Sequence, residues 1–193
     1  MKDRKLTNGP TTYVNMPLGI LVMLFMSSCL SESDDNSAAV SIGQAVPQFK
    51  TNVALTDSAD WRYNTSRNYI FDSQLALGRR GVYVFFHTSC RDCQRELPVI
   101  QAFYDKVKAD STISLVCISR AEAEDEVMNY WQQQGFTLPV SPQPDRRIYE
   151  MFASSVIPRT YITDRRGKVT NIFTDSDTLT VGQLEEVVRL AAG

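Results

Sequence analysis

An apolar run in the middle of the chain most constrains its fold, because it ends directly before two cysteines and a helix-forming segment. Residues 81–86 read Gly-Val-Tyr-Val-Phe-Phe, a continuous series of β-branched and aromatic residues. This pattern is typical of a strand that is buried on both faces of a largely parallel sheet. From Cys93 to about Lys108, apolar residues recur at helical spacing. The sequence therefore predicts a buried strand, a short loop and an amphipathic helix in direct succession.

Similar patterns extend this order along the chain. A strand or hairpin is expected from Val46 to Leu55, buried strands or hairpin strands at 113–118, 159–163 and 168–173, and a short edge strand at 137–140. Helix starts are expected at a capping pair of Ser119 and Glu122, at Asp145, and at a capping box of Thr180 and Gln183; Gly135 is expected to end the first of these helices. The predicted fold class is α/β, with three layers in which helices cover both faces of a central mixed sheet and a β extension precedes it.

Composition and charge exclude several classes of protein. The 193 residues are 43% hydrophobic, which fits a chain that folds around a core and excludes a disordered or collagen-like one. A net charge of -2 provides no general positive field for phosphates, so we expect no nucleic-acid partner. The four cysteines, Cys29, Cys90, Cys93 and Cys117, are too few and too unevenly spaced for a disulfide-stapled scaffold.

The N-terminal segment predicts export. Three basic residues precede an apolar run over residues 16–26, and this run is shorter than the roughly 20 residues that a membrane-crossing helix needs. Two serines then lead into Cys29. This arrangement resembles the lipobox of bacterial lipoproteins, in which a signal peptidase cuts before the cysteine and its sulfur carries diacylglycerol. We expect a lipoprotein signal peptide over 1–28 and lipid attachment at Cys29; the alternative is an ordinary signal peptide with Cys29 in a loop.

Two further segments complete the predicted domain organisation. Residues 30–37 are polar and acidic and lack aromatic side chains, which favours a flexible acidic tether over 29–43. The composition becomes that of a globular domain from about residue 44, and neither an internal repeat nor a low-complexity tract interrupts it. We therefore expect one folded domain over 44–193.

The pair Cys90-Arg91-Asp92-Cys93 carries the expected chemistry. A Cys-x-x-Cys pair can also be half of a zinc site, but a structural zinc site needs about four ligands, and the chain has one histidine, His87. A thiol at a helix N-terminus faces unpaired N–H groups and the positive end of the helix dipole, which favour the thiolate. Cys90 is therefore the expected nucleophile, and Cys93, one helical turn further on, is placed to attack the mixed disulfide that Cys90 forms.

In these features the chain resembles the thioredoxin superfamily, and specifically the membrane-tethered thiol-disulfide oxidoreductases of the TlpA and ResA type. The resemblance rests on the strand at 82–86, the cysteine pair, Glu96-Leu97-Pro98, and Val156-Ile157-Pro158-Arg159-Thr160 ahead of a hairpin. It implies a thioredoxin-like fold, a cis peptide bond at Pro158, and a backbone group of Ile157 that pairs with an extended substrate chain. It also implies that Glu96 lies near the dithiol and raises or couples its proton affinity.

Two positions depart from that family's usual pattern. The family commonly has Trp before the first cysteine and Pro before the second, where this chain has Ser89 and Asp92. Arg91 is expected to favour the thiolate of Cys90 and Asp92 to oppose it, so these two redox-tuning residues leave the reduction potential open. No cofactor is expected besides the redox-active disulfide, and no metal.

Simpler interpretations apply to four other features. Cys117 is expected to be a core thiol, because its neighbours in the strand are apolar. His87 is interpreted first as a strand-end residue and second as a proton relay. Glu96 has the alternative of a solvated acid in the first turn of the helix. The acidic residues from Glu122 to Glu126 are interpreted as solvated surface.

Three function classes follow. The leading one is an extracytoplasmic thiol-disulfide oxidoreductase that reduces protein or small-molecule disulfides, lies in a bacterial cell envelope through its lipid anchor, and takes electrons from a membrane thiol-transfer partner. A thiol peroxidase of the peroxiredoxin kind is the first alternative, but His87 and Tyr83 stand where that family has Thr and Pro. The second alternative is a copper-handling lipoprotein of the Sco kind, whose wider cysteine spacing and downstream histidine are lacking here.

Overall fold

The computed structural model describes residues 40–55 and 67–192. The predicted signal peptide over 1–28, the lipid-attachment residue Cys29 and most of the predicted tether lie outside these ranges. Within the two ranges, no helix is both long enough and apolar enough to cross a membrane.

A seven-stranded mixed sheet forms the centre of the domain. Its strands are β1 (Lys50–Leu55), β2 (Arg67–Asp72), β3 (Arg80–Phe86), β4 (Ile113–Ser119), β5 (Val140–Ser141), β6 (Arg159–Thr163) and β7 (Val169–Thr174). The spatial order is β2-β1-β5-β4-β3-β6-β7. β3, β4 and β5 run parallel, whereas all other neighbours pair antiparallel. The mixed sheet and an N-terminal β extension agree with the sequence prediction, whereas β2 lies beyond the predicted range of 46–55.

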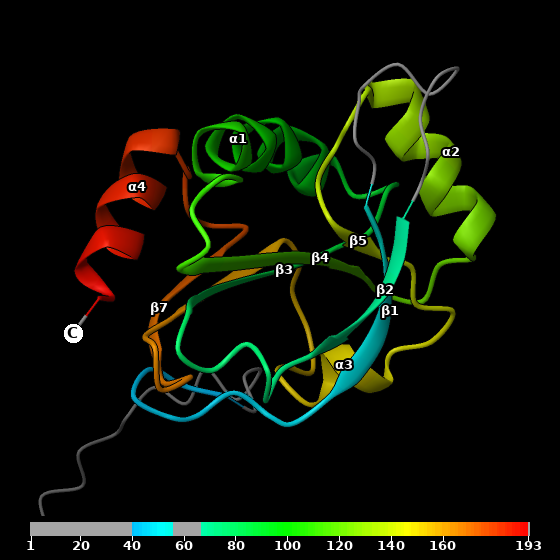
Figure 1. Cartoon of the computed structure of the whole chain (residues 1–193). Helices are drawn as coiled ribbons and strands as arrows, with labels where there is room; N and C mark the ends of the chain where they lie inside the picture. Colours follow the sequence, from blue (N-terminus) through cyan, green and yellow to red (C-terminus); the bar gives the residue numbers. More distant parts are fainter. Residues whose placement is uncertain (1–39, 56–66, 193) are drawn as a thin grey trace, which may run out of the picture. The chain divides into compact units, whose positions relative to one another are not determined.

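Helices lie on both faces of this sheet (Figure 1), which confirms the three predicted layers. They are α1 (Arg91–Val107), α2 (Glu124–Gln134), α3 (Arg147–Glu150) and α4 (Val181–Leu190). One core cluster joins α1, α2 and α4 through Leu97, Trp131 and Leu184. A second cluster on the opposite face contains Tyr149 of α3 and Phe49 from the segment before β1.

Strand β3 is the centre of both clusters. Val82, Val84 and Phe86 belong to the cluster beneath α1, and Tyr83 and Phe85 belong to the opposite one. All five are at most 2% exposed. The continuous apolar run therefore reflects burial on both faces, because successive side chains of a strand point to opposite sides of the sheet.

The short strand predicted at 137–140 is not at an edge of the sheet, so this part of the prediction is wrong. The short strand β5 lies inside the sheet, where Val140 pairs with Ala54 of β1 and with Cys117 of β4. The β1–β2 hairpin extends the sheet beyond β5 and takes the edge position. A two-residue strand carries too little pattern to indicate which strands flank it.

One of the predicted helix starts is also wrong. α2 begins at Glu124 after Ala123, which provides no side-chain cap. Ser119 instead ends β4 and its hydroxyl accepts the backbone N–H of Gln143 at 2.8 Å. Two other helix signals hold, since Thr180 and Gln183 form a full capping box and Gly135 ends α2 in the left-handed region. Asp145 accepts the N–H of Arg147, the first α3 residue, but the N-cap of this helix is Arg146.

Residues just before the predicted domain start also contact it. The backbone N–H of Val40 donates to the carbonyl of Phe152 at 3.0 Å, and that of Gly43 donates to the carbonyl of Val169 at 2.7 Å. Val40 is buried. Contacts with the domain therefore extend at least to Val40.

Candidate active site

Cys90 stands between the end of β3 and the first turn of α1. It is the N-cap of that helix, and its sulfur accepts the backbone N–H of Cys93 at 3.4 Å. The thiol is partly exposed and donates to the carbonyl of Ile157 at 3.6 Å. The helix N-terminus and the segment before β6 therefore meet at this one sulfur.

Cys93 lies behind Cys90 and is buried. Burial raises the pKa of its thiol well above the usual range, and the hydrogen bond with Cys90 and the charge of Glu96 add to this effect. A hydrogen bond with the His87 backbone opposes them. Neither Cys90 nor Cys93 is in a disulfide in the structure. The pair thus consists of an accessible outer thiol and an inner thiol that holds its proton.

The segment before β6 is held beside the pair. The Ile157–Pro158 peptide bond is cis, as the resemblance implies. Val156 lies in the left-handed region with φ 65°, which is rare for a β-branched residue. The Tyr149 hydroxyl donates to the carbonyl of Val156 at 2.9 Å and also contacts that of Ser155. Tyr149 therefore stabilises the conformation that brings Ile157 to Cys90.

Glu96 is buried on the inner face of α1, which contradicts its interpretation as a solvated first-turn acid. It is 8% exposed, and its Oε1 accepts the hydroxyl of Thr160 at 2.7 Å. Burial raises the pKa of this carboxyl to about 7; the Thr160 hydrogen bond opposes the rise, and the charge of Asp177 adds to it. The carboxyl is therefore poised to change protonation near neutral pH.

The two residues between the cysteines face outward. Arg91 is exposed, and Asp92 forms an ion pair with Arg95 one turn along the same helix. Asp92 also lines a pocket of about 280 Å³ beside the dithiol. The pocket is lined by residues of α1, by Pro158 and by the segment between β7 and α4, namely Asp92, Arg95, Glu96, Val99, Pro158, Asp175, Asp177, Thr178 and Leu179.

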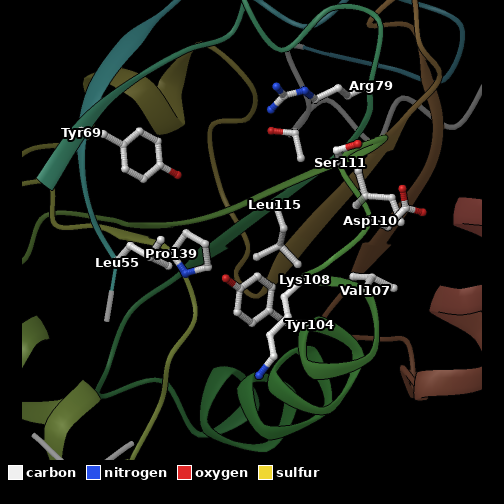
Figure 2. Close-up of a pocket in the computed structure, with 12 residues that line it drawn as sticks. Leu55, Tyr69, Arg79, Tyr104, Val107, Lys108, Asp110, Ser111, Leu115 and Pro139 are labelled. Atoms are coloured by element: carbon white, nitrogen blue, oxygen red, sulfur yellow. The ribbon is translucent and has the colours of Figure 1, made fainter. Parts of the chain in front are cut away.

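A second pocket, of about 290 Å³, lies away from the cysteines. Figure 2 shows its lining side chains, which include Tyr69 of β2, Tyr104 of α1 and Pro139 just before β5. Tyr104 follows Cys90 by 14 positions, a distance of about 21 Å along a helix. This pocket therefore cannot hold a group that reacts with the dithiol.

The structure adds one residue that the sequence interpretation placed on the surface. Glu122 is 3% exposed and accepts the backbone N–H of Thr88 in the cysteine loop. β3 and β4 are parallel, and Phe86 pairs with Ser119, so the loops that follow them meet at one edge of the sheet. The sequence could have indicated this contact, because Glu122 closely follows the second of two predicted buried strands and the loops after neighbouring parallel strands lie at the same edge of the sheet. Cys117, by contrast, is fully buried as predicted.

A thioredoxin-like sheet with two thiols at the start of a helix and a cis-proline opposite them defines a thioredoxin-fold protein. Within that class, the chain belongs to the AhpC/TSA family, whose model matches residues 42–172.

Individual relatives agree with this assignment. The chain is 26% identical over 115 residues to "Thiol-disulfide oxidoreductase ResA" of Bacillus subtilis, an alignment that covers 59% of this chain and 63% of that relative. It is 24% identical over 141 residues to the protein of the same name in Geobacillus kaustophilus, with 72% and 73% covered. The chain thus spans less than two thirds of the first of these relatives.

Solved structures show the same fold. A thiol:disulfide interchange protein of the thioredoxin family from Chlorobium tepidum matches with a TM-score of 0.60 at 21% identity, covering 79% of this chain and 99% of that one. A secreted thiol-disulfide isomerase from Corynebacterium glutamicum matches with a TM-score of 0.60 at 15% identity, covering 77% and 86%.

Proposed function

We propose that this chain is an extracytoplasmic thiol-disulfide oxidoreductase that reduces protein disulfides through Cys90 and Cys93. The observation that carries the proposal is the setting of the Cys90 sulfur, which is partly exposed, accepts the N–H of Cys93 at 3.4 Å and lies 3.6 Å from the carbonyl of Ile157. The names of the ResA relatives support the same activity.

The reaction follows from the unequal burial of the two thiols. The Cys90 thiolate attacks one sulfur of a substrate disulfide, which forms a mixed disulfide and releases the other sulfur as a thiol after protonation. Cys93 then loses its proton and attacks the Cys90 sulfur, so that the substrate leaves fully reduced and the Cys90–Cys93 disulfide holds the two oxidising equivalents. Glu96, with a pKa of about 7, is the candidate acceptor of the Cys93 proton.

The segment at Ile157 supports a role in substrate binding. The carbonyl of Ile157 already accepts a hydrogen bond from the Cys90 thiol. An extended substrate chain beside the cysteine would pair with this backbone, as in other strand-addition modes of peptide recognition. The pocket beside Pro158 would take neighbouring side chains of that substrate.

Location and electron supply belong to the same proposal. The sequence of residues 1–29 favours a lipoprotein signal and lipid attachment at Cys29 in a bacterial cell envelope. A protein that reduces disulfides in an oxidising compartment must itself be reduced again, so a membrane thiol-transfer donor is the expected partner.

Disulfide exchange by the full-length chain tests the activity. The wild type should equilibrate reversibly with a dithiol/disulfide buffer in a two-electron transition, and Cys93→Ser should accumulate a mixed disulfide with the substrate. Cys117→Ala, which leaves the pair intact, is the control and should exchange like the wild type. Absence of exchange in the wild type contradicts the proposal; rapid peroxide consumption or tight copper binding in its place would favour one of the two alternatives.

A further inference from the structure

Glu122 forms a buried carboxylate contact with the loop that carries Cys90. The backbone N–H of Thr88 lies 3.0 Å from both carboxylate oxygens, and the Thr88 hydroxyl donates to Oε1. The Nδ1 atom of His87 is 3.4 Å from the same oxygen. One side chain from the β4–α2 connection thus binds Thr88 in the loop through two donors and lies close to His87, whose Nδ1 accepts the backbone N–H of Ser89 at 3.2 Å.

Thr88 is fixed from its other side as well. The side-chain amide of Gln94, in the first turn of α1, donates to the carbonyl of Thr88 at 2.7 Å. The N–H of Cys90 donates to the carbonyl of His87 at 3.1 Å. All the polar groups of Thr88 are therefore occupied, and the path of the loop into Cys90 depends on them.

The backbone that presents Glu122 is itself held in an unusual conformation. Ala121 lies in the left-handed region with φ 58°, which is uncommon for a residue other than glycine. Its N–H donates to the carbonyl of Asp145 at 3.0 Å, and the N–H of Glu122 donates to that of Gln143 at 2.8 Å. Backbone strain of this kind tends to persist where the surrounding structure fixes a functional group.

We propose that Glu122 is a positioning residue for Cys90: by holding Thr88, its carboxylate keeps the Cys90 sulfur against the N–H of Cys93. The importance of Glu122 for disulfide exchange rests on the proposed function. The hydrogen bond from Cys93 favours the thiolate, so a loosened loop makes Cys90 less reactive at a given pH. A carboxylate suits this place because it accepts several donors, whereas one end of an amide is itself a donor.

The test compares Glu122→Gln and Glu122→Ala with Glu124→Gln, an exposed acid two residues away in the first turn of α2. The readout is the rate of Cys90 alkylation by iodoacetamide as a function of pH in folded protein, in a Cys93→Ser, Cys117→Ala background. Mass spectrometry of the peptide that contains Cys90 separates its alkylation from that of Cys29. The ionisable residues His87, Arg91, Asp92 and Glu96 around the pair are the same in all of these variants.

Both Glu122 variants should alkylate about tenfold more slowly at pH 7, with the pH–rate profile moved to higher pH, while Glu124→Gln behaves like the background. A profile moved to lower pH would show that Glu122 acts only as a nearby negative charge. An unchanged profile together with lower stability would show that it only supports the fold. Either result overturns the proposal.

Thr88→Val provides a second variant in case the Glu122 variants do not fold. It removes the hydroxyl donor and keeps the backbone N–H, so alkylation should slow about threefold; an unchanged rate overturns the proposal. Disulfide exchange is measured separately, with Cys93 present, in the wild type and the variants. If the wild type exchanges no disulfide, the proposed function fails, but the alkylation profile still decides whether Glu122 positions Cys90.

Discussion

The hydroxyl of Thr160 donates to the buried carboxyl of Glu96 at 2.7 Å, which joins β6 to α1 two residues after the cis-proline. The contact lies on the inner side of the dithiol helix, where burial holds the pKa of Glu96 at about 7 against an ordinary value of 4.5. The charged form of this side chain is therefore less favourable in the folded protein than in the unfolded chain.

This pKa difference predicts how stability depends on pH. Between pH 4.5 and about 7, the folded state keeps a proton on Glu96 that the unfolded chain has lost. The free energy of unfolding should therefore fall as the pH rises through this window, by up to about 3 kcal/mol at about 1.4 kcal/mol per pKa unit. Glu96→Gln should remove this slope and be more stable than the wild type at pH 7.5.

Urea unfolding at pH 5.0, 6.0, 7.0 and 7.5 measures this effect. Glu126→Gln, an exposed acid on α2, is the control and should keep the slope of the wild type. The same slope in Glu96→Gln as in the wild type would contradict the assignment of this proton to Glu96.

A side chain added at Gly81 should cause a steric clash in the sheet. A Cβ atom at this position would lie 2.5 Å from Oγ1 of Thr163 and 2.6 Å from the ring of Tyr83. Gly81→Ala should therefore lower the free energy of unfolding by about 1–3 kcal/mol through overpacking. Gly182→Ala is the matched control, because nothing lies within 4 Å of its added Cβ, and it should raise stability by about 0.5–1 kcal/mol through helix propensity. Similar effects of both substitutions on urea midpoints would argue against the close approach at Gly81.

Helix α4 depends on its capping box. The Thr180 hydroxyl accepts the backbone N–H of Gln183, whose side chain accepts the N–H of Thr180. Thr180→Ala should lower the unfolding free energy by about 1 kcal/mol, since it leaves a donor of the first turn without its partner. Thr178→Ala, at an exposed position just before the helix, should change it by less than about 0.5 kcal/mol. Equal losses in thermal unfolding would show that the cap contributes nothing specific.

The sequence predicts best those elements whose signal is local. The buried strand β3, the dithiol at the start of α1 and the capping box of α4 are each encoded within a short stretch and appear where expected. The interior place of β5 and the burial of Glu122 depend instead on contacts between distant segments. The two residues of β5 pair with β1 on one side and with β4 on the other. Glu122 follows β4 and contacts the loop that follows β3, the strand beside it. Residue type alone carries no such information.

For Glu96, the sequence predicts one property and misses another. Its spacing from the dithiol could be read from the sequence, whereas its burial results from Thr160 on β6 and from the β7–α4 segment that carries Asp177. A glutamate in the first turns of a helix is usually a solvated partner of the helix dipole. Only the packing of these elements around α1 turns it into a buried acid.

A substitution at Tyr149 should affect substrate binding and leave the reaction of the thiols largely unaffected. Its hydroxyl holds the carbonyls of Ser155 and Val156, and Val156 has a left-handed backbone directly before Ile157. Tyr149→Phe removes both hydrogen bonds and leaves both cysteines in place. If the Ile157 backbone pairs with an extended substrate, exchange with a peptide disulfide should slow about three- to tenfold, chiefly through a higher KM. Exchange with a small aromatic disulfide, which needs no such pairing, should change by less than twofold.

Tyr69→Phe, which removes a hydroxyl from β2 in the pocket away from the cysteines, controls for the loss of a phenol and should not affect either substrate. Stopped-flow measurements with both disulfides, normalised to folded protein, provide the comparison. If Tyr149→Phe slows exchange with both substrates equally, Tyr149 acts on Cys90 and not on the substrate chain. A loss of backbone pairing would slow only the peptide disulfide, because the small disulfide has no chain to pair. If it slows neither, the Ile157 segment keeps its conformation without the Tyr149 hydroxyl, and the other contacts around Pro158 are sufficient to hold it.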